Sequence, residues 1–400
     1  MIEKVRSKIK HAAPCDFWML ILVTMLAVFS VIMVFSASYY KSLNESGSPY
    51  SYLKKQIFFV GVGFLLMYAA SYIDYHFWRR WSILILGLSF ALLLAVLAIG
   101  STANGAQRWI AVGPLTIMPG EIAKPAMILF TAAYFAADMK RARRFTGLLF
   151  IAAVTAMAAG LIVLQPNLST AITICLIVLG MALLAGMSWK ILIALIGVGA
   201  GGFVFIASLG NYMSRRILSF TNPFKDPSGD GFQAVQSLLA LGTGGLFGLG
   251  LGKSVQKNLY LPEPQNDFIL AIIGEELGFV GVLLLLIVFL LLVWRGFRAA
   301  MDAPDNFGML LAGGITLMIG IQVVLNVAVV TSSMPPTGIA LPFISYGGNA
   351  TWIFMGSAGI MLNISRQGMH PQEEKPERHT PQRLSERRKQ RSRRISGGRV

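Results

Sequence analysis

Residues 261–294 read LPEPQNDFILAIIGEELGFVGVLLLLIVFLLLVW, and this stretch decides the fold. A polar loop ends at Asp267, and an apolar run over 268–294 follows that is long enough to span the roughly 30 Å of a membrane's hydrocarbon as a helix. Two further acids, Glu275 and Glu276, lie inside the run, about 12 Å below Asp267 if the chain is helical. Ionisable groups in a membrane segment are costly and normally face a cavity, a partner or a substrate path. An acid at the surface above two acids within it indicates chemistry on something lipid-borne.

The rest of the chain has the same apolar character. Hydrophobic residues make up 55% of its 400 residues and charged residues 13%, whereas soluble domains carry roughly 25% charged residues. We therefore expect an all-α polytopic membrane protein with one long extracytoplasmic loop, 209–267. Apolar runs of spanning length predict about ten transmembrane helices, at 17–36, 57–73, 82–99, 121–137, 147–164, 168–187, 190–208, 268–294, 308–331 and 339–364.

Positive charge sets the expected orientation. Basic residues cluster at the N-terminus, at 79–80, at 140–144, at 295–298 and after residue 366, and in membrane proteins the cytoplasmic loops carry the excess of Lys and Arg. Counting ten helices from an inside N-terminus places every cluster, and both termini, in the cytoplasm. The first helix is too long for a cleavable signal peptide, so we expect it to stay in the protein.

The expected organisation has three parts: a cytoplasmic segment 1–16, a ten-helix transmembrane domain 17–365 and a basic tail 366–400. The net charge of +16 would suit a nucleic-acid ligand, but the tail supplies much of that charge. The tail is polar and nearly free of large apolar residues, so we expect it to be disordered and to contact anionic lipid on the cytoplasmic face. No nucleic-acid partner is predicted.

Two external segments differ from ordinary connections. In loop 209–267, residues 232–241 have helical periodicity, whereas the run 242–252 (GTGGLFGLGLG) is too rich in Gly for a stable helix and suits a tight or re-entrant backbone. Residues 335–349 (PPTGIALPFISYGGN) should break or delay the last helix. Non-helical backbone at this depth is tolerated where it lines a cavity, so this segment is predicted to border a site.

The external loop 100–120 and the helix after it hold further candidate residues. Arg108 offers a planar fork for phosphate and Trp109 a face for a sugar, although both residue types are also ordinary interfacial anchors. Glu121 and Lys124 stand one turn apart at a helix start, where they can pair. That pair serves either as a structural ion pair or as part of a site for an anionic head group.

Several expected signatures of other enzyme classes are missing. The sequence has no P-loop, no nucleotide-binding fold and no DxD pair on an external loop to hold a metal–nucleotide sugar. Cys15 and Cys175 form no CxxC or Cys/His cluster, so neither a disulfide nor a zinc site is predicted. The substrate is therefore expected to arrive already activated and anchored in the membrane. No cofactor is assigned, and a divalent cation, Mg or Mn, stays open because no dedicated ligand set is visible.

Taken together, these motifs resemble the SEDS family of bacterial cell-wall proteins (FtsW, RodA and SpoVE) over nearly all of 15–366, with the FtsW/SpoVE branch closest. The resemblance is carried by GAQRW at 105–109, EIAK at 121–124, QP at 165–166, NPF at 222–224, GFQ at 231–233, LPE at 261–263, DFI at 267–269, EELG at 275–278 and the segment 337–348. Two sites depart from the family pattern. Asn167 and Ser169 stand where Asp and Gly are usual, and Gly120 stands where Ser is usual; Asn167 on its own is explained as a helix N-cap.

The resemblance implies a peptidoglycan glycosyltransferase that polymerises lipid II on the outer face of the bacterial cytoplasmic membrane, for septal wall synthesis in cell division. It also implies a class B penicillin-binding protein as partner, together with other divisome or elongation proteins. Asp267 matches the family's essential acid. The predicted substrate-binding residues are Arg108, Trp109, Glu121, Lys124, Glu275 and Ser345.

For the chemistry, our hypothesis makes Asp267 the general base toward the 4-hydroxyl of an acceptor sugar. Arg108 and Lys124 would neutralise the departing pyrophosphate, with Arg215 and Arg216 as weaker candidates.

The two acids inside the apolar run are expected to differ in role. Counted around a helix from Asp267, Glu275 should lie nearer the substrate, and Glu276 should be structural and paired with a neighbouring helix.

Two other functions would also explain ten helices and buried acids. One is a lipid II flippase, and the other is a non-catalytic division scaffold. The predicted acids cluster in the external half of the bundle, whereas a flippase needs a polar route through the whole bilayer, so the enzyme is favoured.

Overall fold

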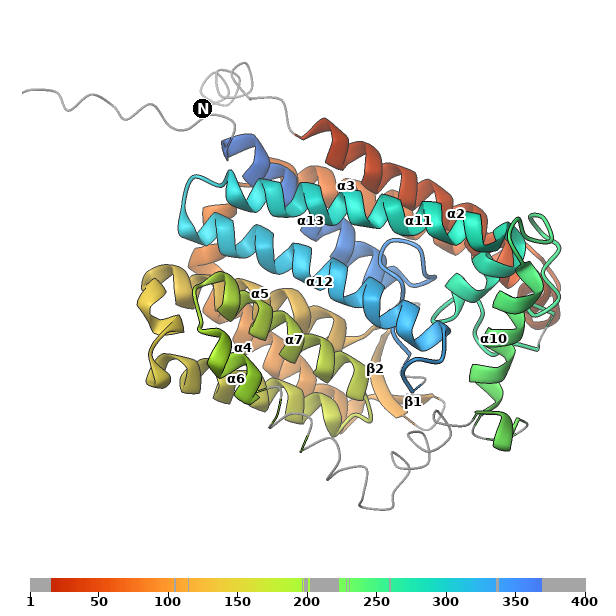
Figure 1. Cartoon of the computed structure of the whole chain (residues 1–400), viewed down its shortest axis with the longest axis horizontal. Coiled ribbons are helices and arrows are strands. Elements are labelled where there is room, and N and C mark those ends of the chain that lie inside the picture. The colour runs from red at the N-terminus through yellow and green to blue at the C-terminus, as the bar shows by residue number, and fades with distance from the viewer. Residues whose placement is uncertain are drawn as a thin grey trace, which may run out of the picture.

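The computed structural model describes residues 16–103, 106–113, 115–195, 197, 201, 223–227, 229, 231–258, 260–335 and 338–368. Most of these residues form long helices that run side by side, and the shorter α10 (Phe232–Gly244) lies across one end of them (Figure 1). The long described helices are α2 (Phe17–Ser46), α3 (Ser51–Tyr72), α4 (Tyr75–Ile99), α5 (Pro119–Ala137), α6 (Phe145–Val163), α7 (Leu168–Leu184), α11 (Ile269–Met301), α12 (Asn306–Val330) and α13 (Gly348–Gly368).

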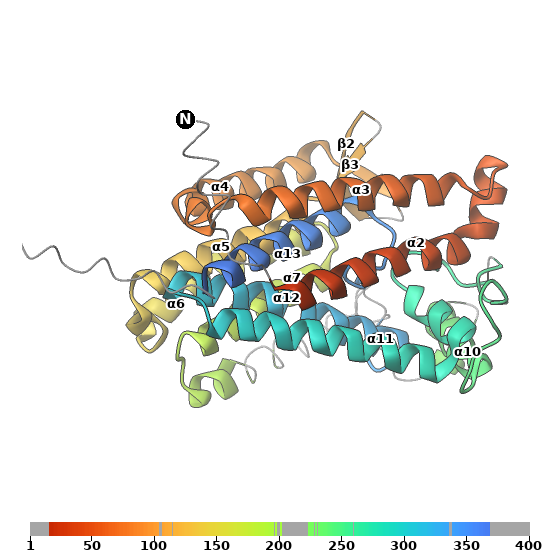
Figure 2. The same cartoon turned by 90° about the horizontal axis from the view of Figure 1, so that it is seen from above.

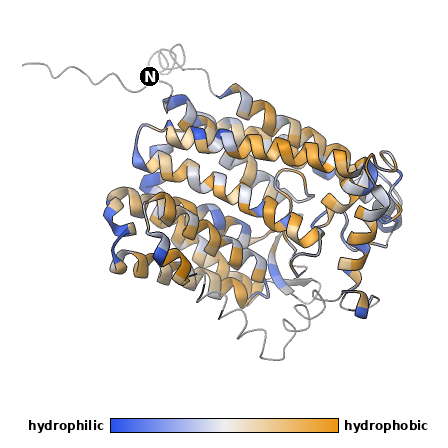
Figure 3. Ribbon diagram, in the orientation of Figure 1, coloured by the Kyte–Doolittle hydropathy of each residue, from blue (hydrophilic) through white to orange (hydrophobic). Residues whose placement is uncertain are grey.

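Each of these long helices corresponds to one predicted span, which confirms the all-α polytopic fold. The predicted span 190–208 and the first part of loop 209–267 lie largely outside the described residues, as do 1–15 and the tail beyond 368. Among the described helices, six are long and apolar enough to cross a membrane: α2, α3, α4, α6, α11 and α12. Hydrophobic residues cover the lengths of the helices, and hydrophilic residues gather toward their ends (Figure 3).

Close contacts between helices build the bundle. α13 packs against α3, α12 packs against α11 and α7, and α4 packs against α5; Figure 2 shows α13 running beside α3. A Cβ added at Gly359 would lie 2.3 Å from the backbone oxygen of Met67, so glycine is what allows α13 to approach α3 this closely. Small residues at helix crossings are the usual route to tight packing in a membrane, because lipid is as apolar as the side chains.

The first two helices are longer than predicted. α2 continues to Ser46 and α3 begins at Ser51, so most of the predicted external loop 37–56 is helical. A hydropathy window detects only the apolar part of a helix, whereas the added segments, 37–46 and 51–56, are rich in polar residues. Gly47, in the left-handed conformation at φ 66°, ends α2.

The loop 100–120, predicted to be external, contains a small sheet that the sequence did not predict. Three antiparallel strands lie in the order β1 (Ser101–Ala103), β2 (Ala106–Val112) and β3 (Leu115–Ile117). β2 contacts both α4 and α5, and it carries Arg108 and Trp109. The sheet therefore holds these two residues on a fixed backbone.

The last helix begins at Gly348 instead of the predicted residue 339. Residues 339–347 are not helical, as the prolines and glycines of 335–349 predict. The delayed start is confirmed, and the span boundary drawn from hydropathy is wrong because apolar residues continue through the irregular segment.

The Gly-rich run after α10 packs into a break in α11. Gly278 has φ 69° and ψ −172°, which interrupts the helix. Residues 245–250 replace the hydrogen bonds lost there, through Phe279 N to Gly245 O (2.9 Å), Val280 N to Leu246 O (3.1 Å), Leu249 N to Glu275 O (2.9 Å) and Gly250 N to Glu276 O (3.0 Å). A Cβ added at Gly248 would lie 2.2 Å from the backbone carbonyl oxygen of Glu276. The tight backbone predicted for the run 242–252 is confirmed over 245–250, whereas the prediction that the run is not helical is wrong for 242–244, which form the last turn of α10.

Candidate active site

Asp267 lies at the end of the bundle that carries α10, in the turn immediately before α11. Its carbonyl accepts a hydrogen bond from Asn326 Nδ2 (2.9 Å), and the same amide donates to the carbonyl of Ile339 (2.6 Å). Asn326 is fully buried on α12. One side chain therefore joins the turn before α11 to the segment before α13.

Gly338 brings that second segment against the Asp267 carboxyl group. Gly338 has φ +75°, and a Cβ added there would lie 3.1 Å from Asp267 Oδ2. A side chain at 338 would be strained by its backbone and would also crowd the carboxylate. Glycine is therefore needed for the close approach, and the segment borders Asp267 as the sequence predicts.

Ser345 connects the same two segments. Its hydroxyl donates to the carbonyl of Asn266 (2.7 Å) and accepts from the backbone N–H of Leu341 (2.7 Å), and Tyr346 N donates to the carbonyl of Gln265 (2.9 Å). Ser345 is buried. Its predicted role in substrate binding stays a prediction, and the contacts observed are those of a loop clamp.

Glu263 and burial set the acidity of Asp267. Glu263, at φ 49°, accepts from Asn266 Nδ2 (2.8 Å) and pairs with Lys41 (2.5 Å). Burial raises the pKa of Asp267 to about 6, Glu263 adds to the rise, the Arg108 guanidinium opposes it, and Glu121 adds a smaller rise. A carboxyl group with this pKa is ionised at neutral pH yet basic enough to accept a proton.

Arg108 reaches from β2 to the turn between α6 and α7. Its Nε donates to the carbonyl of Gln165 (3.4 Å), and its Nη2 donates to the carbonyl of Pro166. Trp109, the next residue of β2, is half-buried. The guanidinium is therefore held by two backbone carbonyls while its charge acts on Asp267.

Glu121 and Lys124 form the ion pair that their spacing predicts. Lys124 Nζ lies 2.7 Å from Glu121 Oε2 and donates to Gln322 Oε1 (3.0 Å), and it lies 5.7 Å from the centre of the Phe354 ring. Lys124 is only 1% exposed. Gln322 and Asn326 are one turn apart on α12, so one helix face holds both Lys124 and the backbone of Asp267.

The two departures from the family pattern are neighbours in space. Asn167 is buried and caps α7, accepting from Thr170 N (3.4 Å) and from Ser169 Oγ (3.1 Å), as the N-cap reading predicts. A Cβ added at Gly120 would lie 3.5 Å from Asn167 Nδ2, a buried amide nitrogen for which the described residues provide no hydrogen-bond acceptor. Positions 120 and 167 are therefore adjacent in this structure.

Glu276 is paired as predicted. It is fully buried, lies 2.8 Å from Lys257 Nζ and accepts from Ser36 Oγ of α2 (2.6 Å). Lys257 Nζ also contacts Ser36 Oγ (3.1 Å). These three residues link α2, α11 and the loop after α10.

Glu275 contacts the same loop as Glu276. It is fully buried and accepts from Ser254 Oγ and from the backbone N–H of Val255 (2.9 Å). The helical angle counted from Asp267 is wrong because Asp267 precedes α11. Glu275 and Glu276 both accept hydrogen bonds from residues 254–255 of the loop after α10. A role for Glu275 in binding substrate stays a prediction.

Sequence reasoning missed Gln322, Asn326 and Lys257. The signal for the first two was present: they are isolated polar residues, one helical turn apart, in an otherwise apolar span. Lys257 lies in a loop with no pattern to mark it. Arg215 and Arg216 lie outside the described residues. Within the part of the chain that the structure describes, no three His, Cys, Asp or Glu side chains gather as a metal-binding set, and assistance by Mg or Mn stays a prediction.

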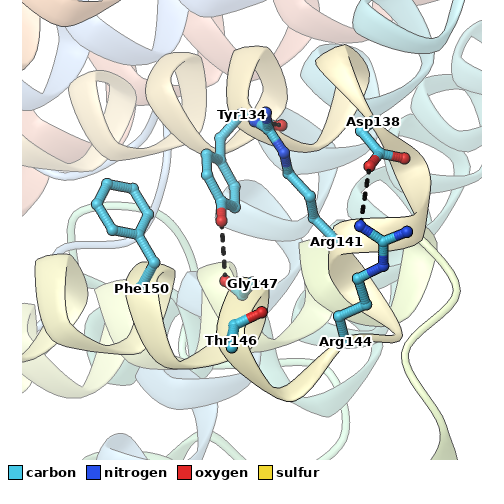
Figure 4. A pocket seen from close by; sticks show the side chains of 7 residues that line it. All are labelled: Tyr134, Asp138, Arg141, Arg144, Thr146, Gly147 and Phe150. Atoms are coloured by element: carbon cyan, nitrogen blue, oxygen red, sulfur yellow. Dashed lines mark hydrogen bonds and ion pairs between the residues drawn. The ribbon is translucent and has the colours of Figure 1, made fainter.

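A cavity of about 470 Å³ lies between the C-terminal end of α5 and the start of α6 (Figure 4). The residues that line it do not include Asp267, Arg108 or Lys124. Its polar groups are bonded to one another: Tyr134 donates to the carbonyl of Gly147 (3.2 Å), Arg141 to the carbonyl of Tyr134 (3.0 Å), and Arg144 lies 3.9 Å from Asp138. The reactive groups gather around Asp267 instead.

The fold and the site together define a polytopic helical membrane protein with a half-buried acid, Asp267, at one end of the bundle. Residues 17–370 match the model of the cell cycle protein family FtsW/RodA/SpoVE, and the chain belongs to that family.

Its relatives and structural neighbours agree. The chain is 41% identical over 360 residues to stage V sporulation protein E of Bacillus subtilis, covering 89% of this chain and 98% of that protein. It is 39% identical over 353 residues to a probable peptidoglycan glycosyltransferase FtsW of Geobacter sp. (strain M18), covering 88% and 96%.

Among solved structures, a chain of a peptidoglycan synthase complex that coordinates polymerization and crosslinking matches with a TM-score of 0.73, 26% identity and coverage of 88% and 98%. The rod shape determining protein RodA of Thermus thermophilus matches with a TM-score of 0.66, 27% identity and coverage of 89% and 98%.

Proposed function

We propose that this protein is a peptidoglycan glycosyltransferase that polymerises lipid II on the outer face of the cytoplasmic membrane, in the wall synthesis of cell division. The observation that carries the proposal is the Asp267 carboxyl group, half-buried between two clamped segments, with a pKa raised to about 6. The names of its relatives, which include probable peptidoglycan glycosyltransferases, support the same activity.

In the proposed reaction, the Asp267 carboxylate accepts the proton of the 4-hydroxyl group of the acceptor sugar. The freed oxygen attacks the anomeric carbon of the lipid-linked donor, a new carbon–oxygen bond forms, and the bond to the pyrophosphate breaks with its electron pair. Undecaprenyl pyrophosphate leaves, and a single displacement converts the α-phosphate linkage into a β-glycosidic one. General-base assistance of this kind contributes about 10²–10⁴-fold to a rate.

The cations have unequal roles in this proposal. Arg108 lies on the rigid sheet with its charge acting on Asp267, and it is the better candidate for contact with the pyrophosphate. Lys124 is buried and already bonded to Glu121 and Gln322. It is therefore assigned a structural position beside the site, where it neutralises the negative charge of Glu121 near an anionic substrate.

The proposed setting follows from the same assignment. The end that carries Asp267 and α10 faces the outside, both termini are cytoplasmic, and a class B penicillin-binding protein crosslinks the strands that this protein makes. The structural match to a chain of a peptidoglycan synthase complex supports such a partner.

The decisive experiment is polymerisation of purified lipid II by the purified protein in detergent. With no membrane to cross and no divisome to recruit, an enzyme makes glycan strands, whereas a flippase or a scaffold does not. Strands that form with wild-type protein but not with the Asp267→Ala variant are the expected result. No polymer from correctly folded wild-type protein, with and without the partner transpeptidase, would overturn the proposal.

A further inference from the structure

The loop of residues 246–251 that follows α10 presents apolar side chains outward. Leu246 is 64% exposed and Phe247 is 80% exposed, and Leu249 and Leu251 are exposed as well. Such a patch is normally covered by something. The backbone of the loop, in contrast, is bonded to the break in α11, so the side chains are displayed on a fixed support.

The hydrogen bonds at the break place this loop at a definite depth. Residues 245–250 bond to residues 275–280 of α11, and Glu276 bonds to Ser36 of α2. On α2, which has no break, a helix rises about 27 Å between Trp18 and Ser36. On α11, a similar length of helix separates Trp294 from Glu276.

Trp18 and Trp294 are both exposed, and exposed tryptophans near helix ends mark the level of a membrane interface. Since the hydrocarbon is about 30 Å thick, the 246–251 loop lies near the opposite boundary, at the level where acyl chains meet head groups. Exposed Tyr39 and Tyr40 on α2 mark that same level.

The apolar patch continues the lipid-facing surface of α11. Phe279 and Val280, which bond to the backbone of Gly245 and Leu246, have exposed side chains, and so do Leu283 and Leu284 below them. Where the loop meets α11, the bonded residues on both sides, Leu246 and Val280, are apolar and exposed. What surrounds the helix face therefore also surrounds the loop.

We propose that the 246–251 loop is an interfacial insert, with Leu246, Phe247 and Leu251 immersed in the acyl chains of the outer leaflet. The ligand is the hydrocarbon of the lipid itself. The loop can enter apolar surroundings because backbone groups of Gly245, Leu246, Leu249 and Gly250 are bonded to α11 at the Gly278 break, and unbonded backbone is what hydrocarbon excludes.

The loop is also anchored from behind. In the segment that follows it, Lys257 is buried against Glu276 at 2.8 Å, and Glu275 accepts from Ser254 and Val255. The buried acids of α11 thus hold the insert at its depth. That the loop faces the outer leaflet rests on the proposed orientation, whereas its contact with lipid does not.

The test uses spin labels in the full chain reconstituted in lipid vesicles. Cys15 and Cys175 are replaced by Ser, and single cysteines are introduced as Phe247→Cys and Leu251→Cys. Leu284→Cys on the lipid face of α11 and Lys253→Cys, two residues after the loop, are the matched controls. Collision rates with oxygen, which concentrates in hydrocarbon, and with a water-soluble nickel chelate are then measured for each label.

We expect the ratio of oxygen to nickel collisions at 247 and 251 to lie closer to that of Leu284→Cys than to that of Lys253→Cys. A ratio equal to that of Lys253→Cys would place the loop in water and overturn the proposal. Low collision rates with both reagents would show that protein, such as a second copy, covers the loop, and would also overturn it. Because neither position touches the Asp267 site, lipid II polymerisation by each variant checks the fold, and the collision data stand whether or not that activity is found.

Discussion

Asp267 and Glu276 are close in sequence, yet their surroundings are opposite. Glu276 is fully buried, and Lys257, Ser36 and the loop after α10 use its carboxylate. Asp267 is half-buried; its backbone is clamped by Asn326, while its carboxyl group faces Gly338 and has a raised pKa. Asp267 is fixed through its backbone, so its carboxyl group stays available for proton transfer. Glu276 is fixed through its carboxylate, so its charge stabilises the fold instead.

The largest effect is expected at Asp267. Asp267→Asn keeps the shape of the side chain but removes the base, so lipid II polymerisation should fall by about 10²–10⁴-fold. Because Asn326 bonds to the backbone of residue 267, thermal unfolding should change little. The matched control is Glu275→Gln, which changes an acid in the same way on α11. If Asp267→Asn and Glu275→Gln lose turnover equally when the amounts of folded protein are matched, Asp267 does not differ in role from the acids of α11.

The next effect is on stability and concerns Glu276. Glu276→Gln leaves Lys257 as a buried charge without its partner, which costs about 3–5 kcal/mol. The melting temperature in detergent should fall, while turnover per folded molecule stays near that of wild type.

The double variant Glu276→Gln with Lys257→Met should recover much of the loss, since it removes the unpaired charge as well. A double variant that is less stable than Glu276→Gln alone would mean that Lys257 has another essential contact.

Asn326 connects the two kinds of role. Asn326→Ala removes the two hydrogen bonds that hold the carbonyls of Asp267 and Ile339. A misplacement of about 1 Å at a reacting group costs up to about 10²-fold in rate, so kcat should fall by about tenfold or more with a smaller change in KM. Gln322→Ala, one turn away, contacts Lys124 instead and serves as the control. A change confined to the melting temperature would assign Asn326 to the fold alone.

Much of the fold could be predicted from the sequence because lipid imposes one rule on every span. Hydropathy located the described helices, and the prolines and glycines of 335–349 predicted the delayed start of α13. Hydropathy did not predict the helix ends where the helices continue into polar sequence, as at Ser46 and Ser51. It also failed in loop 100–120, where short strands pair with each other and leave no long pattern.

The site was predicted in part. Spacing within one helix was enough for the pair Glu121–Lys124, and an acid before a span was enough to single out Asp267. The clamps by Asn326 and Ser345 join segments far apart in the chain, and one sequence carries no signal for such contacts. The helical angle assigned to Glu275 was counted from Asp267, which precedes α11, so it does not describe the contacts observed, and the role of Glu275 in binding substrate stays a prediction.

The pH dependence gives a smaller but sharper test. Since the pKa of Asp267 is raised to about 6, the carboxylate that accepts the proton is the main form above pH 6 and is lost as the pH falls below it. kcat/KM for lipid II should therefore fall about tenfold per pH unit on the acid side. A profile that stays flat from pH 7 down to pH 5 would contradict the assignment of Asp267 as the base.

The smallest expected effect separates the charge of Arg108 from its geometry. Arg108 lowers the pKa of Asp267 and also donates to the carbonyls of Gln165 and Pro166. Arg108→Lys keeps the charge but not the fork, so turnover should fall by a few-fold, by an amount on the order of 1 kcal/mol, while the acid limb of the pH profile stays in place. Arg108→Gln removes the charge, so the acid limb should move to higher pH. If both variants shift the acid limb of the pH profile equally, the position of the cation matters and its charge alone does not. If neither variant changes turnover or the pH profile, Arg108 stabilises the turn at Gln165 and Pro166 and is not part of the site around Asp267.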